Sequence, residues 1–256
     1  MKKMLFFIHV DKKVDIQLYS SLFNMRNVVF VKERVDVRWG HITQIEAYLN
    51  TFKYCIDDSY DRIFLLSGDT LPLHNLEYLS KYCEENADKE FVSCKICLDA
   101  YIDRIRYDNS FWYSSNIIKR IFGKIRNTLG FKILNPKFDK LPQLYFGSNW
   151  IGITQQCLSY LIKYVNNNPD FYDAFKNSVC GDELFFQTII MNSSFSKSII
   201  PSGIMFVDWT DKGSHPRILQ NEDFDELLNI SRSYLFARKF SISLDFQKYE
   251  DKFLRH

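Results

Sequence analysis

The chain has 256 residues, of which 46% are hydrophobic and 16% aromatic, so it can bury a core without disulfides or a structural metal. Its 33 basic and 31 acidic residues give a net charge of +2, which is too balanced for a dedicated nucleic-acid-binding protein. We expect one globular domain over residues 1–256.

The amino-terminal stretch MKKMLFFIHVDKK contains a short apolar run that ends at Asp11 without a small-residue cleavage site. No segment approaches the ~20 apolar residues that span a bilayer. The six cysteines are scattered, as in reduced proteins, and Cys94-x-x-Cys97 lacks a second pair with zinc spacing. We therefore expect a cytoplasmic protein, either soluble or held peripherally on the inner face of the membrane.

The first half alternates short apolar runs with helical patterns. The expected elements are a strand at 4–10, a helix at 14–23, a strand at 27–32, a helix at 41–58 and a strand at 61–66. This alternation predicts an α/β fold with a parallel sheet covered by helices. Ligands of such sheets bind beyond the carboxyl ends of strands, so residues 9–13 and 67–72 are candidate site loops.

Residues 101–141 mix basic and aromatic residues with little periodicity, and we expect a variable segment on the acceptor side of the molecule. Its middle, residues 117–129, has the pattern of a basic amphipathic helix. One reading is a solvated helix with an apolar underside. The functional alternatives are a lid that faces the acceptor, or a dock of residues 117–132 onto anionic lipid.

Regular patterns return in the second half of the chain. The expected elements are a strand at 144–154 interrupted by Gly147 and Ser148, a helix at 155–165, a strand at 203–210 and a helix at 223–230. Asp223-Phe224-Asp225 is the local match to the Asp-x-Asp metal motif of nucleotide-sugar enzymes. Its surroundings favour the acidic first turn of a helix instead.

The stretch VCGDELFFQTIIMNS places Asp182 and Glu183 directly before a buried helical run. Both carboxylates can cap the first turn of that helix. Alternatively, Asp182 is the cap and Glu183 projects into a cleft as a general base, since a carboxylate removed from water is a better proton acceptor. Both readings stay open at this point.

Three cations near the carboxyl end are flanked by apolar residues, namely Arg217, Arg238 and Lys239. Cations in such surroundings can form a partly buried anion site, because guanidinium and ammonium groups both match phosphate oxygens. Composition alone favours the alternative, in which they are cations at helix ends whose aliphatic stems pack on the core.

Taken in order, several segments resemble the core 2/I-branching β-1,6-N-acetylglucosaminyltransferase and xylosyltransferase family (glycosyltransferase family 14), as a bacterial-type member. The matching segments are FFIHVDKK, RVDVRWGHITQIEAYL, YDRIFLLSGDTLPL, YFGSNWIGIT, GDELFFQTIIMNS, FVDW, SHPRIL and LFARKF. The resemblance implies a GT-A-type, Rossmann-like fold with a mixed, mostly parallel sheet flanked by helices. It also implies a UDP-sugar donor, inversion at the anomeric carbon and no metal cofactor.

The resemblance makes Glu183 the catalytic base. The residues that it places at the donor are Val10, Arg34, Asp69, Arg217, Arg238 and Lys239. The residues that we place at the acceptor are Ser148, Trp150, Asp182 and Trp209. The chain departs from the family where Cys180-Gly181 replaces a common proline, and Asp69 falls one place before the family's frequent aspartate.

The expected function is transfer of a sugar, with N-acetylglucosamine first and xylose or another hexose next, to a hydroxyl of a glycan or glycolipid. The family's membrane anchor, stem and paired cysteines are missing, which fits bacterial surface polysaccharide or lipopolysaccharide synthesis. The alternatives are a catalytically silent glycan-binding module on the same fold and a UDP-sugar hydrolase. Release of UDP with and without acceptor discriminates among the three.

Overall fold

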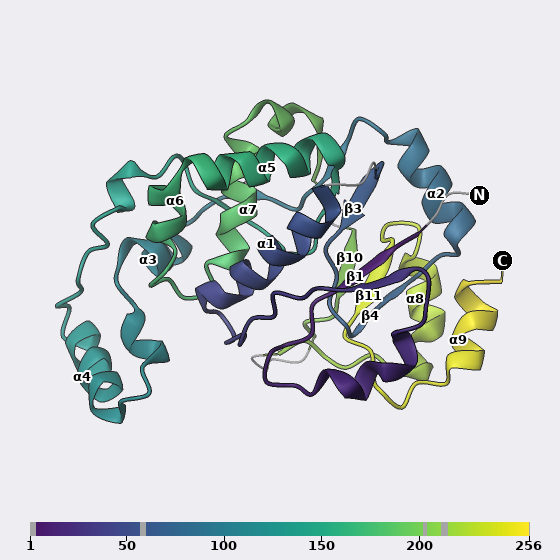
Figure 1. Cartoon of the computed structure of the whole chain (residues 1–256), viewed down its shortest axis with the longest axis horizontal. Coiled ribbons are helices and arrows are strands. Elements are labelled where there is room, and N and C mark those ends of the chain that lie inside the picture. Colours follow the sequence, from purple (N-terminus) through teal and green to yellow (C-terminus); the bar gives the residue numbers. More distant parts are fainter. Residues whose placement is uncertain (1–3, 57–59, 202–203, 211–214, 256) are drawn as a thin grey trace. The chain divides into compact units, whose positions relative to one another are not determined.

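The computed structural model describes residues 4–56, 60–201, 204–210 and 215–255 (Figure 1). The chain divides into two compact units, each assembled from separate stretches of sequence. Unit 1 contains Met1–Tyr60, Cys94–Asn149 and Gln155–Lys197, and unit 2 contains Asp61–Ser93, Trp150–Thr154 and Ser198–His256. The prediction of one domain over the whole chain stays a prediction.

The core of unit 1 is formed by the helices α1 (Ile42–Ile56), α5 (Gln155–Asn167) and α7 (Asp182–Met191), which pack against one another (Figure 1). Helix α7 is buried on all sides from Leu184 to Ile190, because apolar residues occupy every face of it. The predicted helices over 41–58 and 155–165 are confirmed within the described residues. Unit 1 also contains η1 (Ile16–Leu22), α3 (Asp99–Arg106), η2 (Ser110–Tyr113), α4 (Ile117–Thr128), η3 (Phe138–Lys140) and α6 (Pro169–Ala174), and η4 (Ser194–Ser198) follows α7.

Two small sheets belong to unit 1. Strands β1 (Phe6–Ile8) and β2 (Val28–Phe30) pair in parallel, as predicted for the first two strands. Strands β6 (Lys95–Ile96) and β7 (Tyr145–Phe146) pair antiparallel. The segment between β1 and β2 forms the 3-10 helix η1 where an α-helix was predicted.

Unit 2 contains a four-stranded and a three-stranded sheet, both mixed. The four-stranded sheet has the order β3 (Arg62–Phe64), β8 (Gly152–Thr154), β5 (Glu90–Phe91) and β9 (Ile199–Ile200). The three-stranded sheet has the order β10 (Met205–Val207), β11 (Phe236–Arg238) and β4 (Thr70–Pro72). The helices of this unit include α2 (Leu76–Glu85), η5 (Asn221–Asp223), α8 (Phe224–Ile230) and α9 (Phe246–Phe253).

The prediction that the third strand pairs in parallel is wrong. Strand β3 pairs antiparallel with β8, with Phe64 opposite Gly152. A side chain at Gly152 would place its Cβ 2.6 Å from the ring of Phe64, so the missing side chain lets this aromatic ring lie over β8. A single, mostly parallel sheet is therefore not confirmed, and the fold is a mixed α/β fold with small sheets. Among the described residues, no helix has the length and apolar content to cross a bilayer.

Candidate active site

Helix α7 begins after a turn in which Cys180 adopts a positive φ of 51° and its N–H donates to the Gly40 carbonyl oxygen at 2.7 Å. The N-cap residue is Gly181, which makes no side-chain cap hydrogen bond. The predicted cap by Asp182 is therefore not observed. Its carboxylate instead accepts a hydrogen bond from the side-chain amide of Asn149, a partner that sequence reasoning missed.

Of the two adjacent carboxylates, Asp182 is the buried one, with 4% of its surface exposed. Burial raises the pKa of Asp182 to about 6, and the negative charge of Glu183 acts in the same direction. Its buried Oδ1 has no hydrogen-bond partner among the described residues. An ionised carboxylate is thus poorly stabilised at this position, which makes Asp182 a group that titrates near neutral pH.

The side chain of Glu183 is 36% exposed and forms an ion pair with Arg104, whose Nη1 lies 2.6 Å from Oε2. Arg104 comes from α3, and its guanidinium lies 4.8 Å from the ring centre of Tyr101. We did not predict Arg104 as a site residue, although it belongs to the segment expected on the acceptor side. No spacing in the sequence indicates this contact, because Arg104 and Glu183 lie 79 positions apart in the chain.

In unit 2, four predicted site residues meet at the edge formed by β4 and β11. The register of these antiparallel strands places Arg238 opposite Thr70, beside Asp69. Arg238 donates to both carboxylate oxygens of Asp69, at 3.3 and 3.4 Å. The Lys239 ammonium lies 3.6 Å from the same carboxylate, and the Arg238 guanidinium lies 4.6 Å from the ring centre of Trp150.

This cluster carries a surplus of positive charge, because two cations share one carboxylate. Burial alone would raise the pKa of Asp69, but the Ser67 hydroxyl and the charges of Arg238 and Lys239 outweigh burial and lower it. Asp69 therefore stays ionised and holds both cations in place. The Lys239 side chain remains 45% exposed, so its ammonium can still reach an anionic ligand.

Arg217 is bound on both sides by carboxylates. Its Nε donates to Asp208 at 2.6 Å, and its Nη1 and Nη2 donate to the two oxygens of Asp223 at 3.0 and 2.9 Å. Burial alone would raise the pKa of Asp208, but hydrogen bonds from Thr210 and Arg217 outweigh it and lower the pKa. Since both carboxylates pair with the guanidinium, this arrangement favours a structural role for Arg217 over an open anion site.

We therefore expect Arg217→Ala to lower the free energy of unfolding by roughly 1–2 kcal/mol, because it leaves two largely buried carboxylates without their shared cation. Urea unfolding of the purified chain measures this loss. The control is Arg255→Ala, which removes an exposed pair with Asp251 and should cost less than about 0.5 kcal/mol. Equal stability of Arg217→Ala and the wild type would rule out this structural role.

Val10 and Arg34, the two predicted donor-binding residues nearest the amino terminus, contact each other. Arg34 donates through Nε to the Val10 carbonyl oxygen at 3.0 Å and through Nη2 to the Asp11 carbonyl oxygen at 2.8 Å. Val10 itself is 5% exposed. Arg34 thereby satisfies backbone acceptors of the loop that follows β1, which makes it a residue that shapes this loop.

The other predicted acceptor residues have different surroundings. The carbonyl oxygen of Ser148 accepts a hydrogen bond from the buried Gln187 at 2.6 Å. Trp150 packs against the core of unit 2. Trp209 follows β10, and with 60% of its surface exposed its ring is open to solvent.

The structural reading of Asp223-Phe224-Asp225 is confirmed. Asp223 belongs to a capping box with Gln220, and Asp225 lies in the first turn of α8. Cys94 and Cys97 are free thiols, and burial raises the pKa of Cys97 to about 11, so this thiol is protonated at neutral pH.

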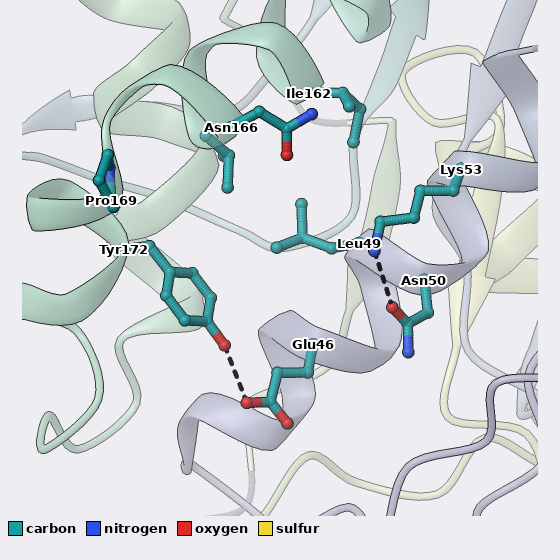
Figure 2. A pocket seen from close by; sticks show the side chains of 9 residues that line it. Glu46, Leu49, Asn50, Lys53, Ile162, Asn166, Pro169 and Tyr172 are labelled. Carbon is teal, nitrogen blue, oxygen red and sulfur yellow. Dashed lines mark hydrogen bonds between the residues drawn. The ribbon is translucent and has the colours of Figure 1, made fainter.

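A surface pocket of unit 1 lies apart from the predicted chemistry (Figure 2). Its lining includes Glu46 and Lys53 of α1 and Tyr172 of α6, and the Tyr172 hydroxyl donates to Glu46 at 2.8 Å. None of the predicted site residues lines it. We assign this pocket no role in catalysis, so Glu46 is suitable as a control position for substitution of Glu183.

The predicted base and the predicted phosphate-binding cations belong to different units. Glu183 lies in unit 1, and Arg217, Arg238 and Lys239 lie in unit 2. The structure shows one cluster within each unit: Asp182, Glu183, Arg104 and Asn149 in unit 1, and Asp69, Trp150, Arg238 and Lys239 in unit 2. The prediction that all of them line one pocket stays a prediction.

Comparison with known proteins agrees with the resemblance noted in the sequence. The family model described as "Core-2/I-Branching enzyme" matches residues 1–228, a range that includes Glu183 and Arg217 but ends before Arg238. The chain is 23% identical to Xylosyltransferase 2 of Rattus norvegicus over 265 residues, which are 94% of this chain and 29% of the relative. It is 22% identical to Xylosyltransferase 2 of Homo sapiens over 267 residues, with 94% and 29% covered.

A third relative is Xylosyltransferase sqv-6 of Caenorhabditis elegans, which is 19% identical over 271 residues, 96% of this chain and 32% of the relative. The chain thus spans about three tenths of the length of these curated relatives. The family match covers most of the chain. The chain therefore belongs to the Core-2/I-Branching enzyme family, glycosyltransferase family 14.

Proposed function

We propose that the chain moves a sugar from a UDP-sugar to a hydroxyl group of a glycan or glycolipid acceptor, with inversion and without a metal, in bacterial surface polysaccharide or lipopolysaccharide synthesis. N-acetylglucosamine is the first candidate sugar from the branching-enzyme resemblance. Xylose is the second candidate, because the relatives at 19–23% identity are named xylosyltransferases. A GT-A-type fold belongs to this proposal.

The observation that carries the proposal is the position of Glu183 at the start of a buried helix. The rigid α7 fixes the backbone of Glu183, its carboxylate stays partly exposed, and Arg104 holds one carboxylate oxygen. In the proposed reaction, Glu183 accepts the proton of the acceptor hydroxyl as that oxygen bonds to the anomeric carbon. The bond from this carbon to the UDP oxygen breaks on the opposite face, through an oxocarbenium-like state.

The leaving diphosphate gains negative charge in this step, and we assign its stabilisation to Arg238 and Lys239. Among the described residues, Asp69 is the carboxylate that both cations contact, so their cluster keeps a net positive charge. Arg217 would have to release Asp208 or Asp223 to contribute directly, and we therefore give it a supporting part. Val10 and Arg34 are proposed at the uracil end of the donor, since Arg34 orders the loop that contains Val10.

On the acceptor side we propose Trp209, whose exposed ring can stack on the apolar face of a sugar, together with Trp150. Ser148 and Asp182 flank the predicted base from the neighbouring loop and from α7. We propose Asp182 as a positioning residue beside the base, because its carboxyl is buried and bonded to Asn149.

Calorimetric titration of UDP in buffer that contains EDTA tests the donor site. The wild type should bind UDP under these conditions, and Lys239→Ala should weaken binding by roughly tenfold, because one cation of the phosphate site is lost. Asp69→Asn should bind UDP as tightly as the wild type or a few-fold more tightly, because it removes the carboxylate that competes for both cations.

The matched control is Lys89→Ala, which removes another lysine of unit 2 whose partner is the neighbouring Asp88. Its UDP affinity should equal that of the wild type. Unchanged affinity in Lys239→Ala would show that the diphosphate site is elsewhere. Binding that disappears in EDTA and returns with Mn²⁺ would contradict the metal-free mechanism.

A further inference from the structure

Helix α4 contacts the remainder of unit 1 closely at a glycine. Gly123 is buried, and a Cβ at this position would lie 2.2 Å from the ring of Phe111 in η2. The glycine therefore lets the helix backbone contact this ring directly. Lys124 and Arg126 lie beside the same contact, 4.9 Å from the Trp112 ring centre and 5.8 Å from the Phe111 ring centre.

The apolar face of α4 points away from this contact. At about 3.6 residues per turn, Ile118, Ile121 and Ile125 fall on the side opposite Gly123. These three side chains are 61%, 51% and 51% exposed. The expected solvated helix with an apolar underside is therefore wrong, because the underside consists of glycine and cationic stems and the apolar face is open.

The segment that contains α4 carries further exposed apolar side chains. They include Ile117 (67%), Phe122 (70%), Leu129 (65%), Phe131 (71%), Ile133 (52%) and Leu134 (63%). Figure 1 shows α4 set apart from α1, α5 and α7 of the same unit. An exposed apolar surface of this kind is uncommon on a soluble protein and indicates an interaction site.

The charged side chains of α4 itself are all positive, whereas Lys132 beyond the helix pairs with Asp103 at 3.1 Å. Residues 109–138 contain no aspartate or glutamate. Lys119, Arg120, Lys124 and Arg126 lie on the flanks and underside of α4, and none of them forms an ion pair with a described carboxylate. Their long side chains can extend along the helix toward a negatively charged surface.

We propose that α4 docks unit 1 onto the surface of an anionic lipid bilayer, with its apolar face in the interface and its cations among the headgroups. Charge decides against a second copy of this chain as the occupant, because a two-fold contact through α4 would bring two sets of like-charged side chains together. An anionic membrane can bury the isoleucines in its interface and attract the cations with its headgroups. This docking is independent of the reaction proposed above.

Co-sedimentation with vesicles tests the docking. The wild type should sediment with vesicles of phosphatidylcholine mixed with phosphatidylglycerol and stay in solution with pure phosphatidylcholine. Ile121→Asp/Ile125→Asp should lower the partition coefficient by roughly tenfold or more, because it removes apolar surface from the interface. Lys119→Gln/Arg120→Gln should lower it by roughly tenfold at low salt and by less at high salt.

Ile242→Asp is the matched control, because Ile242 is 100% exposed and its replacement makes the same chemical change in unit 2, which does not contain α4. This variant should bind vesicles like the wild type. The glutamine pair keeps the test valid if the aspartate pair misfolds, since it leaves the apolar face intact. A wild type that does not sediment with anionic vesicles would overturn the proposal. So would a wild-type dimer in light scattering that Ile121→Asp/Ile125→Asp converts to monomer.

Discussion

Replacing Glu183 by glutamine is expected to lower turnover by about 10²–10⁴-fold, which is the usual contribution of a placed general base. Glutamine has nearly the shape of glutamate, and its amide oxygen can still accept the hydrogen bond from Arg104. The variant therefore keeps the local hydrogen bond but loses the negative charge of Glu183 and its ability to take a proton. UDP binding should be unchanged, because we assign the diphosphate to residues of unit 2.

Turnover is measured as UDP released in the presence of acceptor, and donor binding is measured separately by calorimetry. Glu46→Gln serves as the matched control, because it makes the same substitution at a carboxylate that accepts from Tyr172 in the pocket of Figure 2. This control should retain wild-type turnover. Full activity of Glu183→Gln would remove Glu183 from the mechanism, and equal losses in both variants would mean that the effect is not specific to the base.

Replacing Asp182 by asparagine is expected to abolish the part of the pH dependence of stability that comes from the titration of Asp182. The pKa of Asp182 rises from 3.8 to about 6 on folding, so the folded chain binds this proton more tightly than the unfolded chain. The bound proton of Asp182 therefore adds to the free energy of unfolding. This contribution is fully present below the unfolded pKa of 3.8 and is lost as the pH rises through the folded pKa of about 6. The ionised group then costs the wild type roughly 2–3 kcal/mol at neutral pH.

The asparagine side chain of this variant is neutral at every pH, and its carbonyl oxygen can still accept a hydrogen bond from Asn149. Asp182→Asn should therefore be the more stable protein at neutral pH, and the difference should vanish near pH 4. Urea unfolding across this pH range measures both curves. The opposite control is Asp170→Asn, because hydrogen bonds from Lys137 and Lys140 lower the pKa of Asp170 to about 2.

Asp170 contributes stability that is present above its unfolded pKa and is lost as the pH falls, so its replacement cannot produce the profile expected for Asp182. A wild type and an Asp182→Asn variant with parallel stability curves between pH 4 and 7 would contradict the raised pKa. The same experiment tests Asp182 independently of Glu183, because it measures stability and does not depend on turnover.

The sequence alone was sufficient for the family and for the longer helices. Eight short segments in a fixed order identify a family even where each is unspecific, and the family match over residues 1–228 confirms this identification. The helices α1 and α5 followed from apolar periodicity over at least three turns. The helical position of Asp223-Phe224-Asp225 followed from the preference of acidic residues for a first turn.

Only the tertiary structure decided which residues touch. Strands of two or three residues carry too little pattern to specify a partner, and so β3 pairs with β8, which is far away in the chain. For the same reason the sequence could not show that Arg104 binds Glu183 or that Asp182 is the buried carboxylate. Periodicity predicted that α4 is amphipathic, but it is the contact between Gly123 and Phe111 that turns its apolar face outward. A sequence pattern determines which faces a helix has, whereas the direction of each face depends on distant neighbours.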